Sequence, residues 1–285
     1  MRTLLTAILG LVVGHLGASV AFGQNVPEGL KAAGIEIVKE GEWNGLKRYD
    51  FALPGSRAKS IIVAPKTVAE GKPWIWRARF FGHQPALDLM LLEKGYHLCY
   101  CDVGGLFGAP AAVERWVEFH GLVTEHLKFS QKPVLEGMSR GGLIIFNFAS
   151  AHPDKVSAIY GDNPVCNFVS WPGGRNGKLS SADWERCLKA YGITAAQADD
   201  FRQPKDEETL RPIAAAKIPV ALVVGTADSV VPPKENAEPL AANYEKLGGK
   251  VKVWRKPGLN HHPHGLHPPD ELAAFLVEAV EEAAK

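Results

Sequence analysis

The sequence has 285 residues, of which 46% are hydrophobic and 22% are charged, and this is the composition of an ordinary globular protein. The length is sufficient for one large domain with a sizeable core. Because the formal net charge is only +1 and no basic stripe occurs, we exclude binding to nucleic acid or to a membrane surface as its function.

The first residues differ from the rest of the chain. An arginine precedes the apolar run 4–13, and small residues end the segment at Gly23. This order is typical of a secretory signal peptide, whereas His15 disfavours the alternative of an uncleaved membrane anchor. We expect residues 1–23 to be removed and residues 24–285 to form one domain, secreted or periplasmic, without stable membrane insertion.

Short runs rich in β-branched and aromatic residues follow, bounded by glycine or proline. The first two flank Asn44-Gly45, a pair typical of a tight hairpin turn. Further strands are predicted at 59–65, 73–81, 96–103, 133–137, 156–162, 219–226 and 250–258. Helical patterns are predicted at 111–129, 141–151, 233–247 and 269–284. This alternation predicts an α/β fold with a mostly parallel central sheet, an antiparallel N-terminal hairpin and helices on both faces.

One region breaks the alternation. Residues 165–217 show no strand pattern and predict a loop followed by two short helices. Ser180 and Thr194 each begin a capping-box sequence at the expected start of a helix. We therefore predict a small cap insert at about 165–217, placed above the carboxyl ends of the sheet, where ligands of α/β proteins bind.

The four cysteines fall into two pairs. Cys99 and Cys101 alternate along one predicted strand, so both face the same side and are expected to be packed thiols. Cys166 and Cys187 are candidates for a disulfide if the compartment is oxidising. No cysteine pair has the spacing of zinc ligands.

The stretch "VLEGMSRGGL" places Ser139 between two glycines, at the junction of a predicted strand and a predicted helix. It matches the G-x-S-x-G nucleophile elbow, in which the strained turn requires Gly137 and Gly141 because chain segments approach too closely for a Cβ. The alternative is a serine that only caps the helix. We predict that Ser139 is a nucleophile and that the backbone N–H of Arg140 stabilises an oxyanion.

A serine nucleophile needs a base that is oriented by an acid, and in this architecture they follow in the order serine, acid, histidine. Asp228 lies just beyond the predicted strand 219–226 and is the predicted acid. The alternative role for Asp228 is to stabilise a turn. Asp162, at the end of an earlier strand, is a rival for the acid.

Four histidines follow the last predicted strand, at positions 261, 262, 264 and 267. We predict that His261 is the base, with His262 as the alternative, and that His264 supports the loop or contacts substrate. Clustered imidazoles also suit zinc, but no cysteine or acidic residue nearby completes an obvious ligand set, so no metal is predicted.

The remaining site predictions concern the loop after strand 73–81 and the cap. A second oxyanion donor is expected around Phe80–Gly82, and we assign it to Phe81. Arg79 and His83 are candidates for substrate contact, and the alternative is that they only shape the loop. Trp171 is a candidate platform for a sugar ring, although a cap tryptophan more often packs the cap down.

Five segments together carry a family likeness: "PWIWRARFFGHQPALDLMLLEKGYH", "GGLFGAPAAVERW", "EGMSRGGLIIFNFA", "GDNPVCNFVSWPGG" and "HHPHGL". They resemble a bacterial α/β-hydrolase family described as acetyl-xylan-esterase-like or carbohydrate-esterase-like, over nearly all of residues 24–285. The resemblance implies a serine hydrolase of α/β-hydrolase fold, with Ser139 as nucleophile, Asp228 as acid and His261 as base. Asn260 departs from the family pattern, in which glycine precedes the first histidine.

The function predicted from the sequence is an exported serine ester hydrolase that works through an acyl-enzyme and needs no cofactor. Its expected partner is a small-molecule or polysaccharide ester, from which it removes acetyl or methyl groups. One alternative is a prolyl-oligopeptidase-like peptidase with the same catalytic residues, which we rank lower because no propeller domain or acidic motif for a peptide amine is predicted. The other is a non-catalytic binding protein, which has no reason to retain all three residues.

Overall fold

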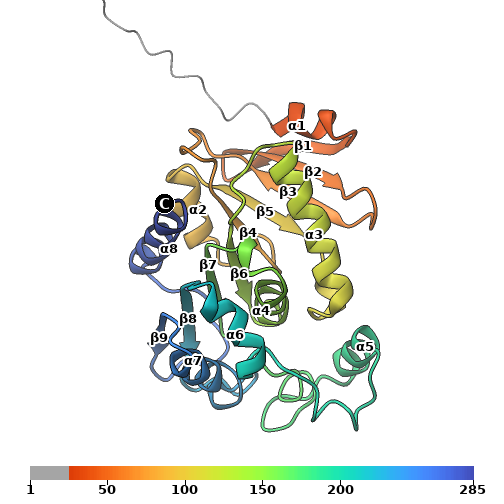
Figure 1. Cartoon of the computed structure of the whole chain (residues 1–285), viewed down its shortest axis with the longest axis vertical. Coiled ribbons are helices and arrows are strands. Elements are labelled where there is room, and N and C mark those ends of the chain that lie inside the picture. Colours follow the sequence, from red (N-terminus) through yellow and green to blue (C-terminus); the bar gives the residue numbers. More distant parts are fainter. Residues whose placement is uncertain (1–25) are drawn as a thin grey trace, which may run out of the picture.

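The computed structural model describes residues 26–285, so the predicted signal peptide, residues 1–23, lies outside the described residues. Within the described part, one sheet of nine strands has the order β1-β2-β3-β5-β4-β6-β7-β8-β9 (Figure 1). The strands are β1 (Ile37–Trp43), β2 (Leu46–Ala52), β3 (Lys59–Val63), β4 (Trp74–Arg77), β5 (His97–Cys101), β6 (Val134–Met138), β7 (Ala158–Asp162), β8 (Val220–Gly225) and β9 (Val251–Lys256).

The sheet is antiparallel at one edge and parallel in the rest. β1, β2, β3 and β5 pair antiparallel in that order. The remaining pairs, β5–β4, β4–β6, β6–β7, β7–β8 and β8–β9, are parallel. The β1–β2 turn is Asn44-Gly45, and both residues have positive φ, 51° and 73°. Positive φ at both central residues is what a type I′ turn requires, so the predicted hairpin is confirmed.

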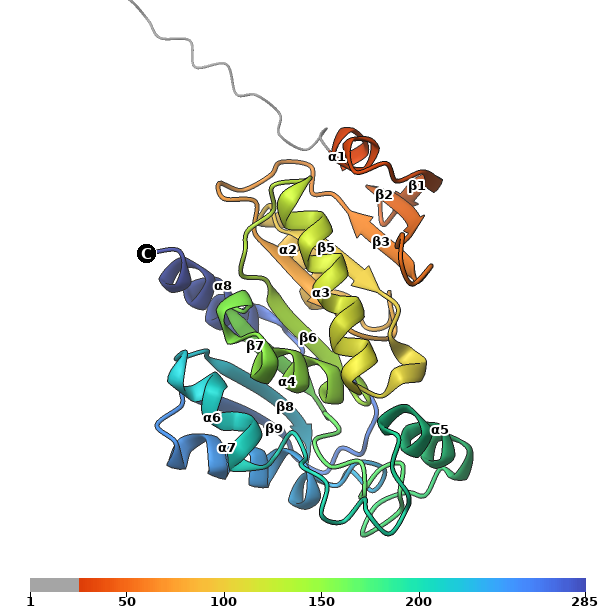
Figure 2. The same ribbon diagram turned by 45° about the vertical axis from the view of Figure 1, so that its right-hand side comes forward.

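Helices cover both faces of the sheet (Figure 2). They are α1 (Val26–Ala32), α2 (Ala86–Glu93), α3 (Pro110–Glu125), α4 (Gly141–Ala151), α5 (Ser181–Tyr191), α6 (Glu207–Ala215), α7 (Ala237–Lys246) and α8 (Asp270–Ala283). α2 and α8 pack on one face, and α1, α3, α4, α6 and α7 on the other. None of the helices in residues 26–285 has both the length and the apolar character needed to cross a membrane.

Alternation along the strands builds the two cores. On β3, Ile61 and Val63 face α2 and α8, while Ile62 faces the larger helical layer. On β4, Trp76 points into that larger layer and stacks on Trp116 of α3, with ring centroids 3.9 Å apart. Successive side chains of a strand point to opposite faces, so each central strand contributes to both apolar layers. The close packing of both layers holds the sheet rigidly in place.

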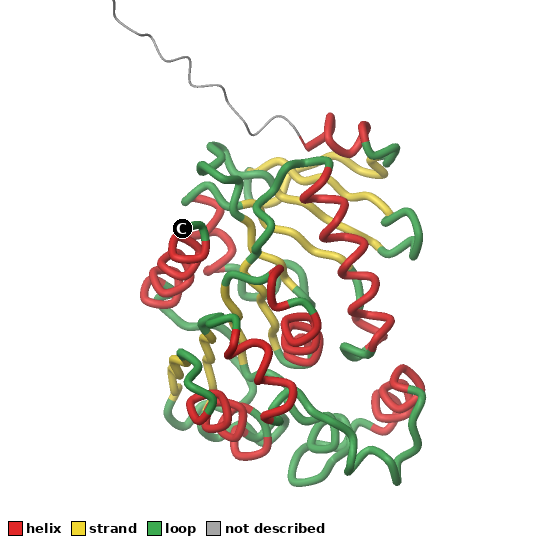
Figure 3. The backbone as a smooth tube through the Cα atoms, in the orientation of Figure 1, coloured by secondary structure: helices red, strands yellow, loops and turns green. Residues whose placement is uncertain are grey.

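Residues 165–217 contain no strand, as predicted, but the two helices in this range have different surroundings. α5 lies among loops away from the sheet, as Figure 3 shows, whereas Leu210 and Ile213 of α6 are buried in the main core. The predicted helix at Thr194 is wrong, since this residue is in a turn where its N–H donates to Gln197 Oε1 at 2.9 Å. The capping sequence therefore closes a turn without starting a helix.

The candidate disulfide is not formed. Cys166 and Cys187 are both free thiols, and each is buried in a different apolar cluster. Cys166 lies in the main core, where its Sγ donates to the Pro164 carbonyl at 3.5 Å, and Cys187 packs inside the cap. Burial raises the pKa of the Cys187 thiol to about 12, so this side chain behaves as a small apolar group.

Candidate active site

Ser139 sits at the apex of the turn between β6 and α4. Its φ is +50°, in the left-handed region that few residues other than glycine adopt. A Cβ on Gly137 would lie 2.6 Å from the Gly141 carbonyl oxygen, and one on Gly142 would lie 2.6 Å from the Val165 carbonyl oxygen. These close approaches explain Gly137 and Gly142, whereas a Cβ on Gly141 would lie 3.4 Å from the Ala78 Cβ, so the predicted steric need for glycine at position 141 is wrong. The strained turn is fixed by the Ser139 N–H, which donates to the Asp162 carbonyl at 2.8 Å.

Ser139, His261 and Asp228 form one hydrogen-bonded chain. His261 Nε2 is 3.0 Å from Ser139 Oγ, and His261 Nδ1 is 2.7 Å from Asp228 Oδ2. The three residues are only 8%, 6% and 4% exposed, so the chain is largely shielded from water. Ser139 follows β6, Asp228 follows β8 and His261 follows β9. The parallel pairing of these strands brings their carboxyl ends to one edge of the sheet.

Asp228 is held by the backbone of its own loop. Its Oδ1 accepts the N–H groups of Val230 and Val231, each at 2.8 Å, while Oδ2 faces His261. The carboxylate thus cannot turn without losing both backbone hydrogen bonds. An acid fixed in this way presets the tautomer of the histidine, with the proton on Nδ1 and the lone pair on Nε2.

Two asparagines position the backbone of His261. Asn163 Nδ2 donates to the His261 carbonyl at 2.9 Å, and Asn163 Oδ1 accepts the Gly225 N–H at 2.7 Å, so it links β8 to the histidine loop. Asn260 Oδ1 accepts the N–H groups of His261 at 2.7 Å and Ser229 at 3.0 Å. Asn163 was missed by the sequence analysis, although its φ of +40° at a strand end is a conformation that asparagine favours.

The rival acid, Asp162, pairs with a different histidine. His264 Nδ1 lies 2.9 Å from Asp162 Oδ1, and the Tyr160 hydroxyl donates to Asp162 Oδ2 at 2.8 Å. Burial alone would raise the pKa of Asp162, but the hydrogen bond and charge of His264, with Lys256, outweigh it and lower that pKa. His264 therefore ties the histidine loop to the end of β7, which agrees with the first of its two predicted roles, support of the loop.

Further buried charged groups lie near the pair of Asp162 and His264. Arg77 contacts Asp88 and lies 3.2 Å from Glu136. Burial raises the pKa of Glu136 well above its usual value, and the positive charge of Arg77 only partly offsets this. One buried guanidinium thus faces two buried carboxyl groups.

The other histidines gather around His261. The ring centroids of His262 and His264 lie 5.1 Å and 4.8 Å from that of His261. His262 and His83 are exposed. Partial burial and the neighbouring imidazole of His264 lower the pKa of both, so both rings are neutral at neutral pH.

The loop after β4 reaches the elbow through Arg79. A Cβ on Gly141 would lie 3.9 Å from the backbone nitrogen of Arg79. Phe81 instead packs its ring on Trp43 and Tyr100, with centroids 5.4 Å and 5.8 Å away. The Arg79 backbone therefore lies beside the elbow, in the loop where a second oxyanion donor is predicted.

Trp171 does not offer an open platform. It is only 6% exposed, and the guanidinium carbon of Arg140 lies 4.7 Å from its ring centroid. Arg140 also forms two hydrogen bonds with Asp183 of α5, at 3.2 Å and 3.1 Å. The residue after Ser139 thus fastens the cap to the elbow, and Trp171 packs the cap down as the alternative interpretation expected.

A narrow hollow of about 10 Å³ opens beside the elbow. Its walls come from the loops after β4 and β5 and from the start of α4: Ala78, Arg79, Val103, Gly104, Phe107, Gly108, Arg140, Gly141 and Ile144. This volume holds about one water-sized group. The hollow therefore leaves room for one small group beside Arg140 and Gly141 of the elbow.

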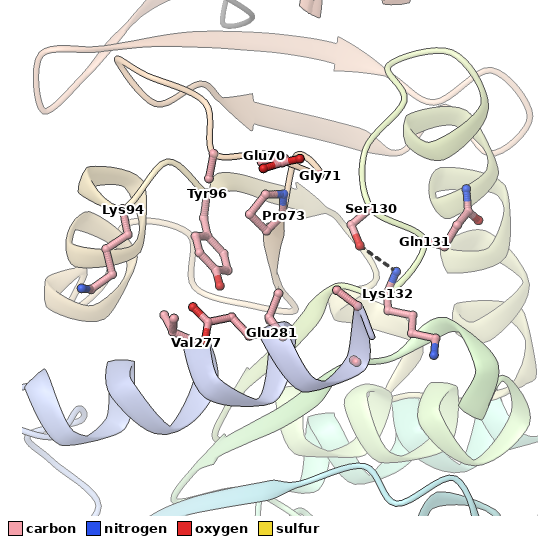
Figure 4. A pocket seen from close by; sticks show the side chains of 14 residues that line it. Glu70, Gly71, Pro73, Lys94, Tyr96, Ser130, Gln131, Lys132, Val277 and Glu281 are labelled. Carbon is pink, nitrogen blue, oxygen red and sulfur yellow. Dashed lines mark hydrogen bonds between the residues drawn. The ribbon is translucent and has the colours of Figure 1, made fainter.

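A larger hollow of about 400 Å³ lies elsewhere, between α8 and the loops before β4 and β6 (Figure 4). Pro73 precedes β4 and Lys132 precedes β6, so this hollow is at the amino ends of the parallel strands, opposite to Ser139. Ligands of open α/β sheets bind at the carboxyl ends of the strands, where Ser139, His261 and Asp228 also lie. We therefore do not assign the larger hollow to the active site.

No family model matches the chain. Over 131 residues, 44% of the chain, it is 32% identical to the acylamino-acid-releasing enzyme of Arabidopsis thaliana, of which it covers 16%. Among solved structures, it is similar to a puromycin-hydrolyzing peptidase of Mycobacterium tuberculosis, with a TM-score of 0.62 and 15% identity over 81% of this chain and 38% of the peptidase. It is also similar to Est1E of Butyrivibrio proteoclasticus, with a TM-score of 0.55 and 19% identity over 86% of this chain and 100% of Est1E.

These likenesses agree with the sheet order and the elbow, and they show that the chain has the α/β-hydrolase fold. The predicted fold class is thereby confirmed. The chain spans only 16% of the plant enzyme and 38% of the peptidase, and the whole of Est1E. The match therefore concerns only a part of the two longer proteins.

Proposed function

We propose that the protein is a serine hydrolase that cleaves carboxylic esters through an acyl-enzyme on Ser139. The observation that carries this proposal is the hydrogen-bonded chain from Ser139 through His261 to Asp228, at 3.0 Å and 2.7 Å. A hydroxyl, an imidazole and a buried carboxylate in this order are the parts needed to activate serine as a nucleophile. The likeness to the esterase Est1E over its full length supports the same class.

In the proposed reaction, Ser139 Oγ attacks the ester carbonyl carbon while His261 Nε2 takes the hydroxyl proton. Asp228 accepts the hydrogen bond from the Nδ1 proton and stabilises the imidazolium. The imidazolium then protonates the departing alcohol as the tetrahedral intermediate collapses. Water repeats the sequence on the acyl-enzyme, with His261 as base again, and releases the acid.

The negative oxygen of the tetrahedral intermediate needs donors that are already in place. The backbone N–H of Arg140 follows the nucleophile directly, and we assign it the first role. We assign the second role to the Arg79 backbone in place of Phe81, because the Arg79 nitrogen lies beside Gly141 of the elbow. Two converging N–H groups of this kind contribute about 3–4 kcal/mol each to transition-state stabilisation.

We further propose a short acyl group, such as acetyl, on a carbohydrate. The hollow of about 10 Å³ beside Arg140 and Gly141 holds about one water-sized group, so only a short acyl chain such as the acetyl methyl is a candidate to enter it. Next to it, Phe80 is 36% exposed and the Arg79 guanidinium carbon lies 5.1 Å from its ring centroid. An aromatic face beside a donor group suits a sugar ring, so Phe80 replaces Trp171 as the stacking candidate.

A peptidase is the second candidate, favoured by the 32% identity to the plant acylamino-acid-releasing enzyme and the fold shared with a peptidase. Parallel assays on acetylated xylo-oligosaccharides, p-nitrophenyl acetate and butyrate, and N-acetyl-aminoacyl peptides separate the two. We expect acetyl esters to be cleaved fastest and peptides at least about 10³-fold more slowly. A higher kcat/KM on a peptide than on any ester would replace the esterase proposal.

We also propose that the protein is exported and begins at Gln24 after cleavage. The proposal is supported by the basic start, the apolar run 4–13 and the small residues before Gln24. Mass spectrometry of the protein isolated from its native host tests it, and we expect an N-terminal peptide that starts at Gln24. An N-terminal peptide that starts at Met1 in the accumulated protein would contradict export by this route.

A further inference from the structure

Three imidazoles gather beside Ser139, and the proposed reaction uses only one of them. One ring nitrogen from each of His261, His262 and His264 lies within 4.8 Å of the others. The three rings are packed edge to face, with centroids 4.8 Å to 5.1 Å apart. Neutral imidazole is the commonest metal ligand in proteins, which makes this cluster a candidate cation site.

Two of the three rings are already oriented as metal ligands are. His261 Nδ1 is 2.7 Å from Asp228, and His264 Nδ1 is 2.9 Å from Asp162. Each carboxylate accepts the Nδ1 proton, so each ring presents its Nε2 lone pair on the other side. Metal-bound histidines commonly have such a carboxylate behind them, and two buried carboxylates also offset the charge of a dication.

The third ligand has the freedom to complete the site. Zinc–nitrogen bonds are about 2.0–2.1 Å, so tetrahedral ligand nitrogens lie about 3.3 Å apart. The three histidine nitrogens are separated by up to 4.8 Å, so the longest of these separations must shorten by about 1.5 Å when zinc binds. His262 is exposed, so its ring can rotate toward the two buried ones. His83, from the loop after β4, has its ring centroid 6.0 Å from that of His264 and can add a fourth nitrogen.

We propose that His261, His262 and His264 bind one Zn²⁺ ion and that this ion reversibly inhibits the enzyme. Zinc on His261 Nε2 takes the lone pair that accepts the Ser139 proton, so zinc and catalysis exclude one another. Zinc binding stands on the three rings alone, whereas the inhibition rests on the proposed role of His261.

Calorimetric titration of the metal-free protein with zinc chloride tests the site without any substrate. We expect one zinc per chain in the parent protein and at least about tenfold weaker binding in His262→Ala, which loses an exposed ligand. His267→Ala is the matched control, because it removes an exposed histidine of the same loop from outside the cluster. No binding in the parent, unchanged affinity in His262→Ala, or an equal loss in His267→Ala would overturn the site.

Ester hydrolysis in the presence of zinc then tests the inhibition. We expect zinc to stop turnover of the parent, a chelator to restore it, and His262→Ala to hydrolyse ester at the parental rate but resist zinc at least about tenfold better. Zinc that binds at His262 without lowering turnover would overturn the competition with His261. If no ester is hydrolysed at all, the proposed function fails, while the calorimetry still decides whether the site exists.

Discussion

Two histidine–aspartate pairs lie in the same region of the molecule, and only one of them reaches a nucleophile. His261 with Asp228 and His264 with Asp162 have similar lengths, 2.7 Å and 2.9 Å, and all four residues are buried. His261 Nε2 lies 3.0 Å from Ser139 Oγ, whereas the ring of His264 faces other histidines. A buried histidine–aspartate pair is therefore not sufficient for a catalytic triad. The histidine must also lie within hydrogen-bond distance of the serine at the elbow, and only His261 does.

The hydrogen bonds that hold the two aspartates also differ. Asp228 is held by two N–H groups of its own loop, which leaves one oxygen for His261. Asp162 accepts from Tyr160 and from the Gly265 backbone as well as from His264, so it joins β7 to the histidine loop. We conclude that the first pair serves catalysis and the second holds the loop in place, and the following predictions test this division.

The largest expected difference is between the two histidines. His261→Gln should lower kcat for ester hydrolysis about 10⁵-fold or more, because the members of a triad act as a unit. His264→Gln, whose amide can still donate to Asp162, should lower kcat less than about tenfold. Both are measured by steady-state kinetics with a chelator present, and equal losses in the two variants would remove the distinction.

The two aspartates should separate activity from stability. Asp228→Asn should lower kcat about 10⁴-fold, because the amide favours the wrong tautomer of His261. Asp162→Asn should lower kcat less than about tenfold but reduce the free energy of unfolding by about 1–3 kcal/mol, since a buried network loses an acceptor. Urea unfolding and kinetics on the same preparations test the pair, and a stable but inactive Asp162→Asn protein would assign Asp162 to catalysis.

The pH dependence of unfolding should depend on the second pair. The pKa of Asp162 is lowered in the folded state, so its charge stabilises the protein above the unfolded pKa of about 3.9, and this contribution is lost as the pH falls through the folded pKa. The difference in unfolding free energy between the parent and Asp162→Asn should be constant above about pH 5 and shrink below about pH 4. A difference that grows on acidification would contradict the direction of the shift.

The smallest effect is expected at the residue that departs from the family pattern. Asn260→Gly removes the oxygen that accepts the N–H groups of His261 and Ser229, so His261 should be less well positioned and kcat should fall about three- to tenfold. Asn260→Asp keeps an acceptor at the same place and should retain most activity. If glycine proved as active as asparagine, the loop would not need these hydrogen bonds.

Much of this site was predictable because local rules agree with the fold. Asn44-Gly45 specifies a hairpin turn, and the alternation of strand and helix specifies a parallel sheet whose carboxyl ends meet. The chain order of Ser139, Asp228 and His261 then selects three loops at that edge. Each of these inferences depends on neighbours in sequence or on a general property of parallel sheets.

The features that were missed depend on contacts between distant segments. The pairing of Asp162 with His264, 102 positions apart, has no signature in either stretch of sequence. The same holds for Arg140, whose guanidinium contacts Asp183 of the cap, and for Cys166 and Cys187, which are buried in separate clusters. Thr194 carried a helix-start pattern, but local hydrogen bonds satisfied it within a turn.

The most direct test of the central claim is covalent labelling with a fluorophosphonate, followed by mass spectrometry of the digested protein. An activated serine attacks phosphorus, so we expect one adduct per chain, located on Ser139. The adduct should be absent from Ser139→Ala and should form at least about 100-fold more slowly in His261→Gln than in the parent. Labelling that persists in Ser139→Ala, or a folded parent that hydrolyses ester without being labelled, would contradict the triad of Ser139, His261 and Asp228.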